Sequence, residues 1–266
     1  MNKTLRDFSD EAYGESAALR YNIFESRPSG FATRIAPKIS TFYQQKSTGT
    51  AKQTLLDVAC GTGQLSTYFL DRGFEIVGLD SSLHMLKYAR ANNAAYVAGG
   101  QAQFLESDAS NFQLEPKFGL AVCTFNGMNH LNSIKHVKSC IANVHRALVP
   151  GGYFVFDINT RLGLKSIVEK IGIEDTDEEI IVRKRIFDGE RIILNASGCF
   201  LHEGVWIRYR ETIFKIIIDT IELRQFMLNN GWDSVTYTTD DFTRSVEGPE
   251  MEQVAYVVAR KEEGVS

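Results

Sequence analysis

The residues from 55 to 66 combine the types and spacing used to bind a nucleotide, and they read LLDVACGTGQLS. Gly61 and Gly63 let the backbone turn sharply and approach a ligand closely. A helix is predicted directly after this turn, and a helix N-terminus favours anionic groups. The turn alone therefore fits the phosphates of a dinucleotide, and neighbouring side chains must decide whether another ligand fits better.

Two further carboxylates have positions suited to a nucleoside. Asp80 follows Gly61 by 19 positions and ends a predicted strand, where it can accept hydrogen bonds from both hydroxyls of a ribose. NAD-binding proteins place an acidic residue at a similar distance, so this spacing does not discriminate between cofactors. Asp108 ends a later strand, where it can accept a hydrogen bond from the exocyclic amine of adenine.

Two details oppose a dinucleotide. Ser66 stands where the third glycine of G-x-G-x-x-G is expected, so the close helix–strand contact of a dinucleotide site is lost. Asp57 places a carboxylate inside the first strand, which suits a cationic ligand better than a pyrophosphate. Together with Asp108, these details fit an adenosine that carries a positive charge and no phosphate, such as S-adenosylmethionine.

The elements that must position these residues alternate between strand and helix from residue 53 onward. Helical patterns separate five predicted strands at residues 54–59, 75–80, 102–108, 119–125 and 153–158. This rhythm predicts right-handed βαβ crossovers and a parallel sheet with helices on both faces. Ligands of such sheets bind at the carboxyl ends of the strands, where Asp57, Asp80 and Asp108 should converge.

The second half of the chain departs from this rhythm. Three β-type runs within residues 161–218, with turns at 188–190 and 202–204, predict an inserted antiparallel meander. A helix from Asp219 and two strands at 233–238 and 252–260 then complete the α/β core. We therefore expect three parts: residues 1–160 with an N-terminal lid segment and the core, the insertion 161–218, and the closing elements 219–266.

Composition excludes several classes of partner. The 266 residues include 29 Lys and Arg against 33 Asp and Glu, giving a net charge of −4, whereas nucleic-acid-binding proteins usually have a basic excess. There is no apolar run near the roughly 20 residues of a membrane-spanning helix, and no secretory signal. The four cysteines form no CxxC pair, and no His/Asp cluster has metal-ligand spacing. We expect a cytoplasmic protein with no metal, membrane or nucleic-acid partner.

Five blocks in this chain resemble the class I S-adenosylmethionine-dependent methyltransferases. They are LLDVACGTGQLS, VGLDSSLHMLKYAR, FLESDA, FGLAVCTFNGMNHL and LVPGGYFVFDINT, in the order found in that family, over about residues 54–160. The resemblance implies a Rossmann-like, seven-stranded, mostly parallel sheet whose reversed final hairpin is residues 233–260. It also implies S-adenosylmethionine as the cofactor.

The resemblance also implies the roles of individual residues. Gly61 and Gly63 match positions that line the methionine moiety, and Asp57 matches the position that orients its amino end. The ring of Phe125 could form either a cofactor wall or part of the core, and Met85 is open in the same way. The core positions implied to bind the cofactor are Asp57, Ala59, Gly61, Gly63, Asp80, Ser81, Met85, Asp108, Ala109 and Phe125.

Two features resemble a smaller group that methylates small molecules, including the amino-sugar N,N-dimethyltransferases. Tyr13 and Tyr21 match paired tyrosines that could fold over the cofactor, although two ordinary helix aromatics would look the same. His130 matches a histidine that faces the substrate, where it could take a proton or only orient the acceptor. The other four histidines are expected to be solvated.

In the same group a β insertion flanks the substrate pocket and can mediate dimerisation. Trp206, Tyr209 and Arg210 are therefore candidates for substrate contact, or else for a solvated face or a subunit interface. We expect a methyltransferase that acts on a nitrogen or oxygen of a small molecule, and a homodimer is possible. Two alternatives stay open: an NAD-dependent oxidoreductase and a non-catalytic S-adenosylmethionine-binding regulator.

Overall fold

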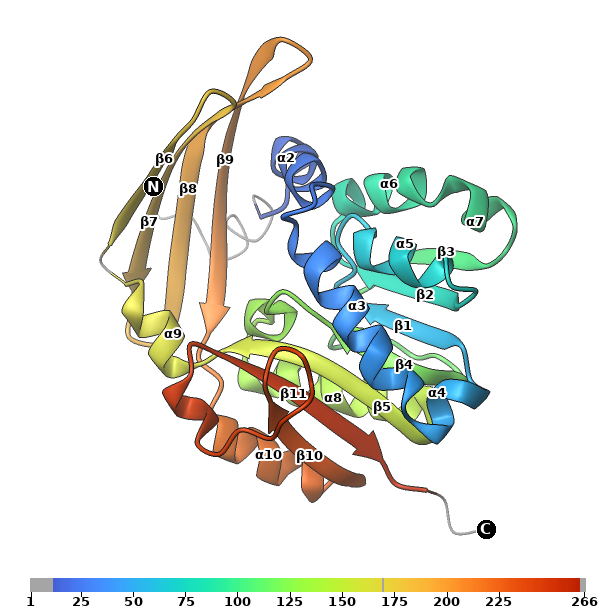
Figure 1. Ribbon diagram of the computed structural model, residues 1–266. Coiled ribbons are helices and arrows are strands. Elements are labelled where there is room, and N and C mark those ends of the chain that lie inside the picture. Colours follow the sequence, from blue (N-terminus) through green and yellow to red (C-terminus); the bar gives the residue numbers. More distant parts are fainter. Residues whose placement is uncertain (1–11, 169, 264–266) are drawn as a thin grey trace.

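The computed structural model describes residues 12–168 and 170–263, and its largest element is a seven-stranded sheet (Figure 1). The strand order is β10-β11-β5-β4-β1-β2-β3. The five strands β1 to β5 pair in parallel, whereas β11 is antiparallel to both β5 and β10. The fold class predicted from the sequence is confirmed. The strands are β1 Thr54–Val58, β2 Glu75–Asp80, β3 Ala102–Glu106, β4 Phe118–Cys123, β5 Leu148–Asn159, β10 Trp232–Thr238 and β11 Val254–Lys261.

Helices cover both faces of this sheet (Figure 1). On one face lie α8 (Ile134–Ala147) and α10 (Thr220–Leu228), and on the other lie α3 (Phe31–Gln44), α5 (Gln64–Leu70) and α6 (Leu83–Asn92). All six residues of the central strand β4 are buried. A strand covered on both faces needs apolar side chains in both directions, which explains the continuous apolar runs in the sequence.

The described part of the chain has further helices. They are α2 (Glu15–Glu25), α4 (Ser47–Ala51), α7 (Ala94–Ala98), α9 (Arg161–Ser166) and the 3-10 helices η1 (Gly127–His130) and η2 (Pro249–Met251). The sequence pattern of residues 1–52 is helical in places but assigns them no role in the core, and α2, α3 and α4 lie there. Helix α2 packs between α6 and β9. Because it is in contact on two sides, it has no single apolar stripe, and hydrophobic periodicity could not reveal it.

The insertion forms a separate four-stranded antiparallel sheet, sheet B, in the order β6-β7-β8-β9. Its strands are β6 Ile171–Asp175, β7 Glu179–Phe187, β8 Arg191–His202 and β9 Val205–Ile216. Three strands were predicted, and β6 was missed. Because β6 is a short edge strand with four of its five residues exposed, it has no alternation of buried and exposed residues to detect.

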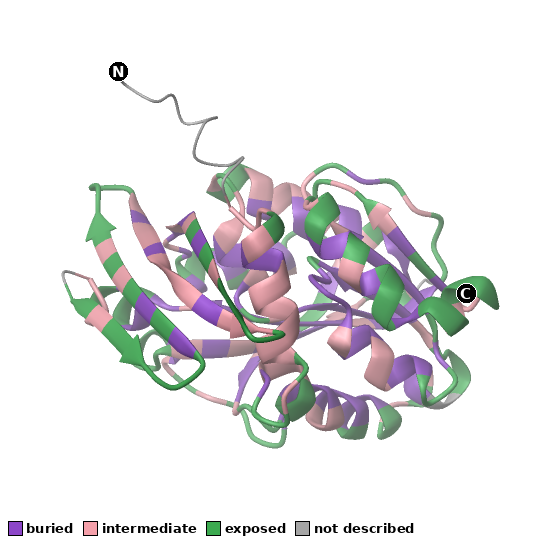
Figure 2. Ribbon diagram, turned by 90° about the horizontal axis from the view of Figure 1, so that it is seen from above, coloured by how far each residue is buried: buried purple, intermediate pink, exposed green. Residues whose placement is uncertain are grey.

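The two faces of sheet B differ (Figure 2). The face toward α2 buries Ile181, Ala196 and Phe200 together with Tyr209, and apolar side chains of α2 pack against them. The opposite face carries Ile173, which is 69% exposed. Sheet B therefore contacts the core through α2, which lies between sheet B and the core in Figure 1.

Within the described residues, no helix has both the length and the apolar character needed to cross a membrane.

Candidate functional site

A cavity of about 540 Å³ opens at the carboxyl edge of the parallel strands. Its wall is built from the ends of β2, β3 and β4, the turn after β1, the start of α6, the segment around α2, η1 and one stretch of β9. This volume lies in the range of small-molecule and cofactor pockets. The predicted site residues on this wall are Tyr13, Tyr21, Ala59, Gly61, Asp80, Ser81, Met85, Asp108, Ala109, Phe125 and His130.

The turn after β1 brings backbone rather than side chain to the cavity. Ala59 and Gly61 have positive φ values of 56°, and the turn is fixed by hydrogen bonds such as that from the Cys60 N–H to the Leu79 carbonyl at 2.9 Å. A Cβ added at Gly61 would lie 3.4 Å from the ring of Tyr21. Glycine there leaves the space between the turn and Tyr21 open.

Gly63 has a different role from the one expected of it. It does not line the cavity, and its φ is +81°. A Cβ there would approach Asn93 Nδ2 to 2.8 Å and Ala89 Cα to 3.1 Å. Glycine at this position therefore lets the start of α5 pack closely against the end of α6.

Asp57 is also set back from the cavity wall. Its side chain is 2% exposed, and its Oδ2 accepts a hydrogen bond from Ser66 Oγ at 2.7 Å. Burial raises the pKa of Asp57 to about 7, although the bond from Ser66 opposes this rise. Ser66, the residue that replaces the third glycine, thus serves as the partner of the buried carboxylate.

Asp80 reaches the cavity with its carboxylate already oriented. Oδ2 accepts from the Gly61 N–H and Oδ1 accepts from the Ser82 N–H, both at 2.9 Å. Burial raises the pKa of Asp80, and these two N–H groups oppose that rise. Each carboxylate oxygen keeps a further lone pair, so the group can still accept two hydrogen bonds from a ligand diol.

Asp108 lines the cavity from the loop that follows β3. Asp108 Oδ1 accepts from the N–H and the Oγ of Ser110, at 2.7 and 2.8 Å. This arrangement holds the loop after β3 and leaves Oδ2 as the acceptor available to an adenine amine. Met85 is 3% exposed and also lines the cavity, so it belongs to both the core and the wall.

The two tyrosines of the N-terminal segment close over the cavity from outside the core. The Tyr13 carbonyl accepts from Ser82 Oγ at 2.9 Å, which ties this segment to the start of α6. The ring centroid of Tyr21 lies 6.0 Å from that of Phe125, and Phe125 stacks on Phe31 at 4.9 Å. Phe125 is 41% exposed, so its ring forms a wall rather than part of the core.

His130 faces the same space from η1. Its Nδ1 lies 3.4 Å from Tyr13 Oη. Burial, with the nearby Lys215 cation, lowers the pKa of His130 to about 3, so the imidazole is neutral. Because burial also raises the pKa of Tyr13, its hydroxyl stays neutral, and its oxygen can accept from Nδ1–H of His130. This geometry favours an orienting role for His130 over that of a general base.

A buried asparagine fixes the position of η1. Asn129 Nδ2 donates to the carbonyls of Asn159 and Ile216, at 3.1 and 3.0 Å, and its Oδ1 accepts from the Asn159 N–H at 2.8 Å. These bonds join η1 to the ends of β5 and β9. Lys215, next to Ile216, donates to Asn159 Oδ1 at 2.9 Å.

Sheet B contributes different residues from those expected. Ile213 and Phe214 of β9 lie on the cavity wall, whereas Trp206, Tyr209 and Arg210 do not. Trp206 and Arg210 are on the outward face, and Tyr209 is buried against α2. Alternation along β9 separates the two faces, but the sequence does not say which face turns inward.

Two histidines expected to be solvated, His84 and His136, also line the cavity, and no spacing pattern could have revealed them. A third, His145, is half-buried and hydrogen-bonds the Gly231 carbonyl at 2.8 Å, so the expectation of a solvated surface was wrong for it. Across the described part of the chain, no group of three His, Cys, Asp or Glu side chains is arranged to hold a metal ion.

Comparison with known proteins agrees with this arrangement. Residues 55–152 match the family described as a methyltransferase domain. This stretch therefore matches a methyltransferase domain, and the structure has the fold of the class I S-adenosylmethionine-dependent methyltransferases. The expected resemblance and the expected cofactor, S-adenosylmethionine, are confirmed at the level of domain and fold.

Particular relatives extend the match beyond the domain. YqeM of Bacillus subtilis (strain 168), named as a methyltransferase, is 26% identical over 220 residues, which cover 81% of this chain and 87% of the relative. The dTDP-3-amino-3,4,6-trideoxy-alpha-D-glucopyranose N,N-dimethyltransferase of Streptomyces venezuelae is 31% identical over 104 residues, 39% of this chain and 41% of that protein. The solved structure of an amino pentose methyltransferase from Micromonospora echinaspora is 19% identical and superimposes with a TM-score of 0.69. The match covers 92% of this chain and 95% of the chain in that structure.

Proposed function

We propose that this protein is an S-adenosylmethionine-dependent methyltransferase that transfers a methyl group to a nitrogen or oxygen of a small molecule. The observation that carries the proposal is the cavity itself. It places the carboxylate of Asp80 and the turn at Gly61 on one wall, and His130 with Tyr13 on another. One cavity thus offers a nucleoside site and a second, less polar space beside it.

The residues present fit the cofactor. Asp80 retains lone pairs for a ribose diol, Asp108 retains an acceptor for an adenine amine, and Gly61 has no side chain where a ligand must pass Tyr21. When bound, S-adenosylmethionine supplies an activated methyl group on its sulfonium. The leaving group needs no further activation, so the protein contributes mainly by positioning the acceptor and excluding water.

His130 and the aromatic residues would carry out that positioning. A neutral imidazole can accept a hydrogen bond from an acceptor N–H or O–H, which directs the lone pair of the nucleophile. In the tautomer with this capacity, Nδ1–H donates to Tyr13 Oη and Nε2 is the accepting nitrogen, while Tyr21 with Phe125 covers the adjoining wall. His130 would therefore orient the acceptor without removing a proton from it.

The acceptor is proposed to be small because the cavity lies between sheet B and the core and its volume is about 540 Å³. An amine acceptor is supported by the partial match to an amino-sugar N,N-dimethyltransferase. The shared 104 residues are 39% of this chain, so this support concerns the reaction class more than the acceptor itself.

The test is binding followed by turnover. Isothermal titration should detect S-adenosylhomocysteine binding and no comparable binding of NADH. Labelled S-adenosylmethionine should then transfer its methyl group to members of a panel of small amines and hydroxyl compounds, amino sugars included. Binding of NADH alone would support the oxidoreductase, whereas cofactor binding without transfer to any acceptor would support the non-catalytic regulator.

A further inference from the structure

Helix α2 faces two different parts of the molecule. On one side, Leu19, Ile23 and Phe24 pack against the buried face of sheet B. On the other side, Tyr21 approaches the Gly61 turn, and Asn22 Oδ1 accepts from Gln64 Nε2 at 3.0 Å. The same helix that covers the proposed cofactor site is therefore held by the insertion.

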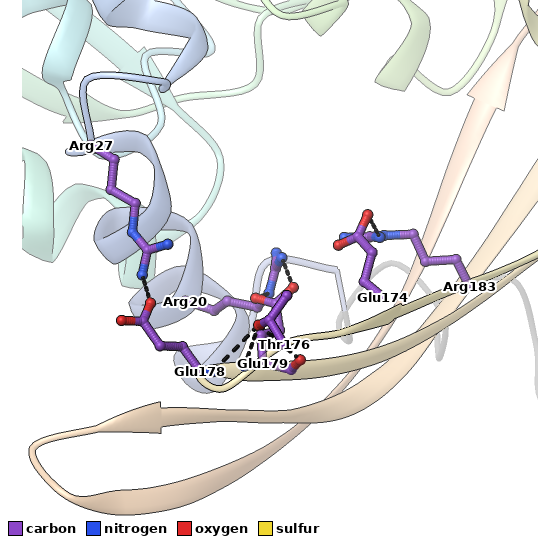
Figure 3. A network of polar contacts seen from close by, with 7 residues as sticks. All are labelled: Arg20, Arg27, Glu174, Thr176, Glu178, Glu179 and Arg183. Atoms are coloured by element: carbon purple, nitrogen blue, oxygen red, sulfur yellow. Dashed lines mark hydrogen bonds and ion pairs between the residues drawn. The ribbon is translucent and has the colours of Figure 1, made fainter.

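Two ion pairs join α2 and the residues just after it to the turn before β7 and the first residue of β7 (Figure 3). Arg20 binds both oxygens of Glu179, at 2.9 Å through Nε and 2.7 Å through a terminal nitrogen, and the two side chains are 17% and 5% exposed. Arg27 binds Glu178 through a single 2.6 Å contact, with side chains 40% and 58% exposed. Arg20 lies within α2 and Arg27 just beyond its end, so the two pairs join neighbouring segments and differ in burial and geometry.

The turn presents Glu179 in a fixed position. Thr176 Oγ1 accepts from the Glu179 N–H at 3.0 Å, and the Thr176 N–H donates to the Glu179 carbonyl at 2.9 Å. The Leu201 N–H donates to the Glu178 carbonyl at 2.7 Å, which joins the turn to β8. Figure 3 shows Thr176 beside the two glutamates. The backbone of Glu179 is thus fixed within sheet B at the point where its side chain meets α2.

Arg20 is held as firmly on its own side. Its guanidinium carbon lies 4.7 Å from the ring centroid of Phe24 and 5.3 Å from that of Tyr209. A planar guanidinium bound at both nitrogens by one carboxylate permits little rotation. If the carboxylate of Glu179 is neutralised, Arg20 loses its two-point contact and keeps only the attraction of Glu211, so α2 is held less firmly.

We infer that Arg20 and Glu179 are positioning residues that hold α2, and with it Tyr21, over the cofactor site, so that sheet B controls how long the cofactor stays bound. The inference rests on the proposed function, because it concerns retention of the same cofactor. The exposed pair Arg27–Glu178 contributes little, since solvent screens it and its single contact does not fix an angle.

The test compares Glu179→Gln with the matched control Glu178→Gln. Hydrogen exchange of the α2 amides and the dissociation rate of S-adenosylhomocysteine are measured for each. Glu179→Gln should accelerate exchange in residues 15–25 and raise the dissociation rate by about tenfold or more, because changes at one binding site act mostly on dissociation. Glu178→Gln should change that rate by less than about twofold.

Two results would overturn the inference while leaving the proposed function intact: unchanged α2 exchange in Glu179→Gln, or faster exchange with an unchanged dissociation rate. If Glu179→Gln does not fold, Arg20→Lys is judged by the same criteria, since it keeps the charge and loses the two-point contact. If the wild-type protein does not bind S-adenosylhomocysteine, both the proposed function and this inference fail.

Discussion

Asp80 shows how a single side chain is prepared for a ligand before the ligand arrives. One backbone N–H from the turn after β1 and one from the start of α6 hold its two oxygens. Its orientation is therefore set by two elements rather than by its own rotamer preference. A carboxylate held in this way loses little freedom when it binds a diol.

Replacing Asp80 with alanine should weaken S-adenosylhomocysteine binding by more than about tenfold, or about 1.4 kcal/mol. The loss comes from two ligand hydrogen bonds and from the N–H groups of Gly61 and Ser82, which lose their acceptor. Calorimetry measures the affinity, with Asp71→Ala as the control because Asp71 is exposed and outside the cavity. Equal affinities for the wild type and Asp80→Ala would refute the ribose assignment.

His130→Ala should lower the turnover number by about tenfold or more while cofactor affinity changes little, as orientation of the acceptor is lost. The pKa of His130 is lowered to about 3, so the wild-type rate should show no titration attributable to this imidazole between about pH 5 and pH 8. Steady-state rates of the wild type and the variant across that pH range measure the loss of turnover and the pH dependence. Turnover of the variant within about twofold of the wild type would remove His130 from the reaction.

At the scale of elements, the contact between α5 and α6 depends on one glycine. Gly63 combines a left-handed φ of +81° with a close approach to Asn93 and Ala89. Gly100 has a similar φ of +75°, but a Cβ there would meet nothing within 4 Å. Comparing substitutions at the two positions therefore separates the cost of a left-handed backbone from the cost of a close helix contact.

Gly100→Ala should destabilise the protein by about 1 kcal/mol, the usual cost of a left-handed conformation for alanine. Gly63→Ala should cost at least about 1 kcal/mol more, because α5 or α6 must shift to admit the methyl group. Urea unfolding of both variants measures the difference. A loss in Gly63→Ala no larger than that in Gly100→Ala would show that the helix contact is not tight.

At the scale of the whole molecule, two buried carboxylates link stability to pH. Burial raises the pKa of Asp57 and of Asp157 to about 7, although the N–H of Asn126 opposes the rise at Asp157. In the unfolded chain an aspartate has a pKa near 3.9. The folded state therefore binds more protons between these values, and stability falls as pH rises from about 4 to about 7.

Asp157→Asn should consequently gain stability relative to the wild type as the pH rises from about 5 to about 7, because the amide has no charge to lose or acquire. Urea unfolding of the cofactor-free protein at several pH values measures this gain. Asp241→Asn is the control, since hydrogen bonds from Thr239 and Thr243 lower the pKa of Asp241 to about 2 and keep it ionised throughout. A difference between Asp157→Asn and the wild type that is constant across this range would contradict the assigned pKa.

Assembly and location belong to the same scale. The outward face of sheet B exposes Ile171 and Ile173 on its edge strand, at 64% and 69%, together with Trp206 at 46%. Because β6 and β9 are the two opposite edges of sheet B, Trp206 does not form one contiguous patch with the two isoleucines. The homodimer and the cytoplasmic location expected from the sequence stay predictions.

The sequence by itself determined the features that depend on local order along the chain. Short apolar runs between helical patterns located β1 to β5, and the rule that parallel strands share a carboxyl edge brought Gly61, Asp80 and Asp108 to one cavity. The resemblance carried by the five blocks then indicated the cofactor. These inferences needed no knowledge of how distant segments meet.

The tertiary structure alone decided the contacts between distant segments. Tyr13 meets His130 across 117 positions, and Arg20 meets Glu179 across 159. Sheet B turns Ile213 toward the cavity and Trp206 away from it, although alternation along β9 permits either arrangement. The physical reason is that a strand's pattern distinguishes its two faces, whereas the packing of α2 against one of them chooses which face lies inside.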